Sequence, residues 1–150
     1  DQQMTHDLFV AAVDATASTS EAVAGASVSK AMPYKTALAK VDADVSQTDK
    51  ETKNLILVGG PIVNSLVAEL ADAGKTKATD WYASQAAGSG IIDLVEDAWA
   101  TGANALVIAG KDADGTRSAT AVIQKYDDYA SDLTGSGVVV QGTVITSVLV

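Results

Sequence analysis

The sequence predicts an α/β fold, in which helices flank a mostly parallel or mixed sheet. A β-rich N-terminal arm and a long C-terminal strand or strands are predicted to complete it. Two short runs, residues 54–58 (NLILV) and 105–109 (ALVIA), are apolar almost throughout and are followed by glycine. Such runs are typical of strands buried on both faces. Segments with helical spacing come after each run, and this alternation favours crossover connections between parallel strands.

The first unit of this fold, residues 54–74, is predicted to be a strand, a tight turn and a helix. Gly59 and Gly60 end the strand. Pro61 is assigned to the first helical position, which tolerates a residue without an N–H, and Gly74 is assigned to the C-cap. The apolar positions that recur at helical spacing are Val63, Leu66, Val67 and Leu70.

A polar connection, residues 75–87, leads to a second predicted helix. Ser89 is its predicted N-cap and Gly102 its end. Trp81 and Tyr82 of the connection are interpreted as packing residues, as is Trp99 in the helix. The positions that recur at helical spacing are Ile91, Ile92, Leu94, Val95, Ala98 and Trp99.

The strand at residues 105–109 ends at Gly110, and a third helix is predicted over residues 116–130, closed by Gly135. The residues of this helix that are predicted to face the core are Ala119, Val122, Ile123 and Tyr126. Residues 133–150 contain no charged residue and are rich in Val, Thr and Ile, which predicts one long strand or a hairpin around Gly142. An uncharged strand left as a bare edge invites pairing with another chain. The strand is therefore expected to lie inside the sheet or to pair with a neighbouring subunit.

The N-terminal third has a different character. Residues 1–29 carry acids but no Lys or Arg and are predicted to form an extended arm. Within them, residues 4–13 read as a strand or a short helix, and residues 12–29 as exposed strand, loop or linker. Residues 49–53 read as a charged turn. The 150 residues are the length of a single domain.

Composition excludes several classes of function. The chain has ten Lys and Arg and nineteen Asp and Glu, which gives a net charge of −9. This negative charge argues against binding nucleic acid or anionic lipid. The chain has no cysteine and one histidine, His6, so thiolate chemistry and a multi-histidine metal site are excluded. No apolar run is long enough to span a membrane. The start at Asp1 and the Ala, Ser, Thr and Val content fit an exported protein whose signal has been cleaved.

Two loops deserve inspection as binding sites. The turn at residues 59–61 precedes a predicted helix N-terminus, but neither a dinucleotide fingerprint nor a phosphate loop is present, so it is interpreted as a tight turn. Residues 111–117 (KDADGTR) resemble the opening of a calcium loop through Asp112 and Asp114. The twelfth position of that loop is Ile123, which cannot ligate, so helix capping is favoured while calcium binding stays open.

No catalytic constellation is found. The G-x-S-x-G motif is absent, and His6 is the one imidazole available as a base. The carboxylates at helical spacing are interpreted as solvated faces; they are Asp93, Glu96, Asp97, Asp127 and Asp128. The sequence therefore predicts no enzyme, and it assigns no catalytic, cofactor-binding or metal-binding residue and no cofactor.

Several segments, taken in order, resemble archaeal S-layer proteins of the methanogen and Thermococcales type. Residues 54–70 (NLILVGGPIVNSLVAEL) are similar to a strand, Gly-Gly-Pro turn and helix of that family. Residues 90–99 (GIIDLVEDAW) resemble its next helix, and residues 105–120 (ALVIAGKDADGTRSAT) its following strand, turn and helix start. Residues 39–45 (AKVDADV) are similar to its acidic lead-in, although Val41 and Ala43 depart from the usual residues. The resemblance covers residues 39–150.

The resemblance implies an extracellular, structural, lattice-forming protein of the archaeal cell surface without enzymatic activity. Members of that family are several times longer, so the chain is expected to be an excised domain or a small relative. The predicted partner is another copy of the chain in a lattice or filament, held by homotypic contacts, of which exchange of strands from residues 1–29 or 133–150 is one candidate form. No nucleic acid, membrane-spanning segment or small-molecule substrate is predicted.

The alternative is a secreted α/β domain that binds a ligand. Such folds usually bind ligands at the loops that follow their strands. Here these loops are residues 60–64 and 110–116.

Overall fold

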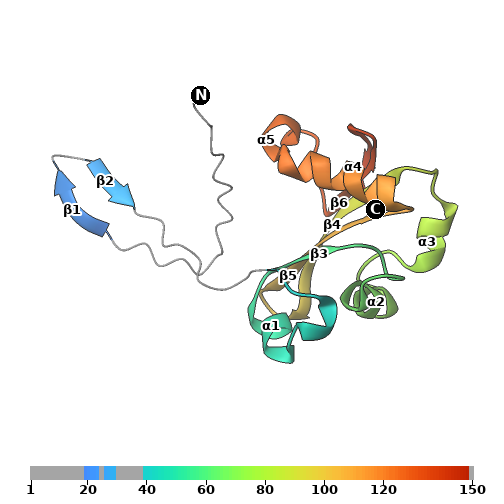
Figure 1. Ribbon diagram of the computed structural model, residues 1–150, viewed down its shortest axis with the longest axis horizontal. Helices are drawn as coiled ribbons and strands as arrows, with labels where there is room; N and C mark the ends of the chain where they lie inside the picture. The colour runs from blue at the N-terminus through green and yellow to red at the C-terminus, as the bar shows by residue number, and fades with distance from the viewer. Residues whose placement is uncertain (1–18, 24–25, 30–38, 149–150) are drawn as a thin grey trace, which may run out of the picture. The chain divides into compact units, whose positions relative to one another are not determined.

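The computed structural model describes residues 19–23, 26–29 and 39–148 (Figure 1). The chain divides into two compact units, Asp1–Ala39 and Lys40–Val150. In the first unit, β1 (Thr19–Val23) pairs antiparallel with β2 (Ala26–Ser29), which agrees with the β-rich character predicted for this region. The strand or short helix predicted at residues 4–13 lies outside the described residues.

The second unit is built on a five-stranded mixed sheet. Its strands are β3 (Leu55–Val58), β4 (Ser89–Ala100), β5 (Ala103–Gly110), β6 (Gly137–Gln141) and β7 (Val144–Val148). They lie in the order β3-β5-β4-β6-β7. The β3–β5 pair is parallel, and the other three pairs are antiparallel. The α/β class is confirmed, in its mixed rather than its mostly parallel form.

Helices cover both faces of this sheet. They are α1 (Gln47–Thr52), α2 (Ser65–Asp72), α3 (Thr79–Ser84), α4 (Ala113–Gln124) and α5 (Tyr126–Tyr129), and a 3-10 turn, η1 (Asp42–Asp44), precedes α1. In Figure 1, α4 and α5 lie above the strands, and α1 and α2 lie below them. We call the face of the sheet that α1, α2 and α3 cover the lower face, and the face that α4 and α5 cover the upper face.

Each face of the sheet has its own hydrophobic core. The lower core contains Leu57, Leu66, Val67, Leu70, Tyr82, Ile91, Val95, Ala98, Ala105, Val107, Ala109 and Val139. The upper core contains Ile92, Ile108, Ala119, Val122, Val138 and Val140. Alternate residues of β4 and β5 enter opposite cores, as strand geometry requires. The packing roles predicted for the three aromatic residues are confirmed, because Tyr82 belongs to the lower core and Trp81 and Trp99 pack against it.

The second predicted helix is wrong, because residues 89–100 form β4, the long strand between β5 and β6. Ile91 and Val95 face the lower core, while Ile92 faces the upper one. A strand that is buried on both faces has apolar residues at consecutive positions, and such a run also satisfies helical spacing. The signals that favour a strand are its β-branched residues and the glycine at its start.

Three other boundaries differ from the predictions. Helix α2 begins at Ser65, with Asn64 as N-cap, so Pro61 lies in the preceding turn and not in the helix. Most of the predicted charged turn at residues 49–53 belongs to α1. The third predicted helix breaks at Lys125 into α4 and α5.

The C-terminal segment forms a hairpin, which confirms one of the two alternatives. Strands β6 and β7 pair antiparallel and are joined at Gly142, whose φ of +62° is in the left-handed region that favours glycine. Strand β6 lies inside the sheet, and β7 lies at its edge. The expectation that this strand lies inside the sheet is therefore met by β6 and not by β7.

Helix α4 approaches the sheet closely through three glycines. A Cβ on Gly115 would lie 2.0 Å from the carbonyl oxygen of Ser89, and one on Gly90 would lie 2.2 Å from the carbonyl oxygen of Gly115. A Cβ on Gly110 would lie 2.2 Å from the backbone nitrogen of Thr116. The first turn of α4 therefore packs directly on the backbones of β4 and β5, where no side chain fits.

We expect Gly115→Ala to destabilise the domain. In an open helix this change would stabilise by about 1 kcal/mol through helix propensity. Here the added methyl group meets backbone that is held in the sheet, because the Ser89 carbonyl already accepts a hydrogen bond from the Lys111 N–H. Overpacking of this kind costs about 1–3 kcal/mol, so a net loss of about 1–2 kcal/mol is expected by urea denaturation. Ser118→Ala on the same helix is the control, and an equally stable Gly115→Ala variant would contradict the packing argument.

Candidate functional site

One cavity of about 840 Å³ lies where β3 and β5 end. Because these strands are parallel, their carboxyl ends meet at the same edge of the sheet. Both loops that the sequence singled out, residues 60–64 and 110–116, contribute to its wall. Its apolar lining includes Val58, Pro61, Ile62, Val63, Ala113 and Ala121. The structure therefore brings the two loops together at one site.

The N-terminus of α2 is already occupied by groups of the chain itself. The Asn64 side chain accepts hydrogen bonds from the N–H groups of Leu66 at 3.1 Å and Val67 at 3.4 Å. A carboxylate oxygen of Asp42 accepts one from the Ser65 N–H at 2.7 Å. Hydrogen bonding by the Ser65 side chain and backbone holds the pKa of Asp42 below its usual value. An external anion would meet this carboxylate, so the structure supports the tight-turn interpretation of residues 59–61.

The N-terminus of α4 is closed in the same way. Asp112 is the N-cap, and its two carboxylate oxygens accept from the Gly115 N–H at 2.9 Å and the Gly88 N–H at 3.0 Å. These backbone bonds, that of Gly115 first, lower the pKa of Asp112. Asp114 pairs with Arg117 instead of turning toward Asp112. The capping role predicted for this loop is confirmed.

The geometry does not assemble a cation site at this loop. Over residues 39–148, the structure contains no group of three or more His, Cys, Asp or Glu placed to hold a metal ion. The cations beside the cavity also have partners, since Lys111 donates to the carbonyl oxygen of Ala83 and Arg117 bonds Asp114. The cavity thus offers apolar surface, and its nearby charges are engaged within the chain.

Tyr82 is one of the residues that line the cavity. Its side chain is 5% exposed, and its hydroxyl is the buried side-chain atom without a hydrogen-bond partner among the residues that the structure describes. Gly60 lies beside the Tyr82 ring, since a Cβ on it would be 3.9 Å from the ring. Burial, and to a lesser extent the charge of Asp93, raises the pKa of Tyr82. The hydroxyl therefore stays protonated and can act as a hydrogen-bond donor.

Asp93 is buried on β4, which corrects its assignment to a solvated helix face. Its side chain is directed to the lower face, and it accepts a hydrogen bond of 2.6 Å from the Thr76 hydroxyl. Burial raises its pKa, against smaller opposing effects of Thr76 and Lys77. The other carboxylates of that prediction, Glu96 and Asp97 on β4 and Asp127 and Asp128 on α5, are exposed.

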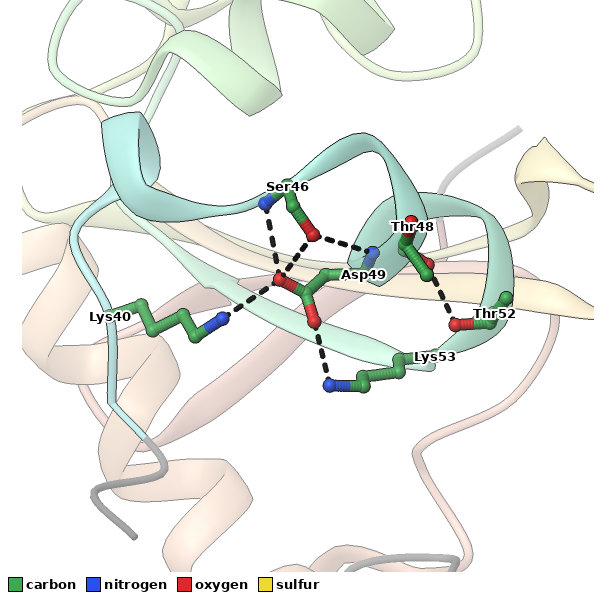
Figure 2. Close-up of polar contacts among 6 residues, drawn as sticks. All are labelled: Lys40, Ser46, Thr48, Asp49, Thr52 and Lys53. Atoms are coloured by element: carbon green, nitrogen blue, oxygen red, sulfur yellow. Dashed lines mark hydrogen bonds and ion pairs between the residues drawn. The ribbon is translucent and has the colours of Figure 1, made fainter.

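The most strongly perturbed carboxylate, Asp49, belongs to a structural cluster (Figure 2). Its oxygens accept from the ammonium groups of Lys40 at 2.8 Å and Lys53 at 2.6 Å and from the Ser46 hydroxyl at 2.8 Å. Ser46 and Asp49 also form a capping box at the start of α1. These interactions, that with Lys40 first, place the pKa of Asp49 far below its usual value. Both carboxylate oxygens of Asp49 accept hydrogen bonds from the chain itself. The cluster therefore stabilises the start of α1 and offers no reactive group.

These features define a class of protein. The fold is an α/β domain in which two helix N-termini carry carboxylates of the same chain, and the cavity beside β3 and β5 is lined mainly by apolar surface. That arrangement suits a structural or apolar-binding module better than an enzyme acting on phosphates. His6 lies outside the described residues. None of the helices that the structure describes is long and apolar enough to cross a membrane.

The chain belongs to the S-layer like family, because the model of that family's outer domain matches residues 2–126. It is 46% identical over 82 residues to an S-layer protein of Methanothermococcus thermolithotrophicus and 44% identical over 82 residues to one of Methanocaldococcus jannaschii. An S-layer protein of Methanococcus voltae is 43% identical over 88 residues. These matches cover 55%, 55% and 59% of the chain. The resemblance to archaeal cell-surface structural proteins is confirmed.

The matches cover only a small part of each relative, 13% in all three. The family match at residues 2–126 also reaches further toward the N-terminus than the segments on which the resemblance was drawn.

We expect Asp49→Asn to destabilise the domain at neutral pH. The folded-state pKa of Asp49 lies below its ordinary value of 3.8, so its stabilisation is complete above about pH 4 and is lost as the pH falls below that value. Thermal melts of the two proteins should therefore differ at pH 7 and converge as the pH falls below 3.8. Asp72→Asn, at an exposed position of α2, is the control. A difference that stays constant with pH would contradict an ionic role.

Asp93→Asn should show the opposite sign. Burial raises the folded-state pKa of Asp93 above 3.8, so the charged carboxylate reduces stability as the pH rises through that window. Asparagine can still accept the hydrogen bond from Thr76 without carrying a charge. We expect the variant to melt higher than the wild type at pH 7, with the gap closing below pH 3.8. Asp127→Asn on α5 is the exposed control, and a lower melting temperature for Asp93→Asn at pH 7 would refute the assignment.

Proposed function

We propose that the chain is a non-enzymatic structural subunit, or a single domain, of an extracellular S-layer-like array held together by homotypic contacts. The observation that carries the proposal is its family membership, since all three relatives named above are S-layer proteins. The chain spans 13% of those relatives. An array role for it therefore requires that contacts between copies, or between domains, use surfaces of this α/β unit.

The arrangement of charges supports a structural role. A net charge of −9 repels other acidic copies at long range. Self-association therefore needs surface where charge is absent or neutralised. The carboxylate of Asp49 pairs with the ammonium groups of Lys40 and Lys53, so its charge is balanced within the chain.

We propose strand exchange as one form that the homotypic contact can take. It can use residues 1–29, of which β1 and β2 are described, or the C-terminal hairpin. Within that hairpin, β6 is paired on both sides by β4 and β7, which makes it a poor candidate for exchange. Strand β7 is paired on one side by β6 and is the better candidate.

A second candidate function is ligand binding at the cavity beside β3 and β5. The unpartnered Tyr82 hydroxyl favours it, because a buried donor is stabilised by an acceptor such as a carbonyl oxygen. The ligand would be mainly apolar, like the cavity wall. This function does not require the chain to assemble.

Electron microscopy of the purified 150-residue chain separates the two functions. We expect ordered filaments or sheets without any added ligand, and we expect deletion of residues 1–20 to abolish them if the N-terminal strands are exchanged. Assembly that persists unchanged after the deletion would exclude exchange of that segment. Discrete small particles at every protein concentration would contradict the array role and favour the ligand-binding one.

A further inference from the structure

The five-stranded sheet has two edges, and both are open within the part of the chain that the structure describes. Strand β3 pairs with β5 on one side, and β7 pairs with β6 on one side. Neither strand contains a charged residue or a proline, since their sequences are LILV and VITSV. Charge and proline are devices by which proteins prevent edge-to-edge pairing. These edges lack both.

The backbone of β3 offers free hydrogen-bonding groups at Ile56. The Gly59 N–H bonds the carbonyl oxygen of Ile108 on β5 at 2.9 Å. Because successive residues of a strand point their backbone groups to opposite sides, Leu57 shares this orientation, and Ile56 and Val58 point away from β5. The Val58 carbonyl already accepts from the Asn64 side chain at 3.1 Å. Ile56 is left to pair with a further strand.

The side chains around the β3 edge are apolar and exposed. Ile56 is 64% exposed and Val58 55% exposed, although each belongs to the sheet. Ile62 and Val63, in the turn that follows β3, are 80% and 75% exposed. Four apolar side chains of the edge strand and its turn are therefore in contact with water, and covering them is favourable.

The β7 edge presents matching side chains on the same face of the sheet. Val148 lies opposite Val138 of the upper core, and it is 45% exposed. Ile56 lies opposite Leu106, which packs against that same core. Ile56 and Val148 are thus both upper-face residues at opposite edges. If the two edges met with the sheet faces continuous, these side chains would fall on one side of the junction.

The directions of the two edge strands, β3 and β7, also suit antiparallel pairing. Strand β4 is antiparallel to β5, β6 is antiparallel to β4, and β7 is antiparallel to β6. Since β3 is parallel to β5, β7 runs opposite to β3. A second copy placed beside the first in the same orientation therefore meets it as an antiparallel pair, which is the slightly more stable kind.

We propose that β7 of one copy pairs antiparallel with β3 of the next, so that the five-stranded sheets join into one continuous sheet. This inference deepens the proposed function and rests on it. The contact joins different surfaces of the two copies, so it leaves a free β3 and a free β7 at the ends and can propagate. Two uncharged edges bring acidic copies together without placing like charges at the junction.

Each junction is expected to be weak by itself. Strand β3 has four residues, and the Val58 carbonyl is taken by Asn64. The register shift between β6 and β7 also bends the other edge. Such contacts become stable in an array, where each copy is held at several places.

Cysteine cross-linking tests the junction, because the chain has no cysteine of its own. Ile56→Cys and Val148→Cys are made in separate full-length chains, mixed under assembly conditions and treated with a short bismaleimide. We expect covalent dimers in the mixture at least five times more abundant than with either variant alone. Tyr126→Cys, on α5 and 60% exposed, replaces either partner as the control. Circular dichroism and thermal melts confirm that each variant is folded.

The remaining outcomes each decide against one of the proposals. Wild-type chain that stays monomeric refutes the proposed function itself. Wild-type assemblies with no excess of the mixed dimer leave that function standing and overturn the β7–β3 junction. Dimers formed mainly by Ile56→Cys alone would show a β3–β3 contact instead. An Ile56→Cys thiol that is protected from a maleimide in the monomer would show that another part of the same chain, or a bound ligand, covers β3, and this also overturns the junction.

Discussion

The structure depends on the contact of α4 with the backbone of the sheet at Gly90, Gly110 and Gly115. Each of these positions leaves less than 2.3 Å between a hypothetical Cβ and neighbouring backbone. Because the helix can approach so closely, Ala119 and Val122 reach the upper core behind it. The same approach brings Asp112 to the Gly88 N–H, so that the helix cap also fastens the start of β4. Packing, capping and the position of the loop after β5 follow from one steric condition.

The helix N-termini beside β3 and β5 are occupied by side chains of the chain itself. At the ends of parallel strands, α/β proteins commonly use helix N-termini to bind anions. Here Asp42 and Asp112 occupy those N-termini. The position that serves ligand chemistry in other proteins is used for internal stability in this one, which agrees with membership of a family of surface proteins. Exposed apolar surface is found at Ile62 and Val63, in the turn that follows the open edge strand β3.

Much of the fold is predictable from the sequence, and the failures have physical causes. Strands β3 and β5 are predictable because short apolar runs that end at a glycine are typical of strands. Strand β4 was missed because a strand buried on both faces loses the alternation that identifies strands. The burial of Asp93 was missed with it, since an acid assigned to a helix surface is expected to be solvated. The cavity-forming loops were found by their place after strands, whereas the Tyr82 hydroxyl carries no sequence signal.

The amino-acid sequence is enough to predict the α/β class, the capping role of Asp112 and the family, because these depend on local patterns and on residues close together in the chain. The strand order, the mixed pairing and the two open edges are visible only in the folded structure. Those properties depend on which strands become neighbours, and strand neighbours are chosen by packing across long stretches of chain. Strand β7, for example, lies at an edge because β6 takes the place beside β4. Its uncharged sequence is compatible with either position.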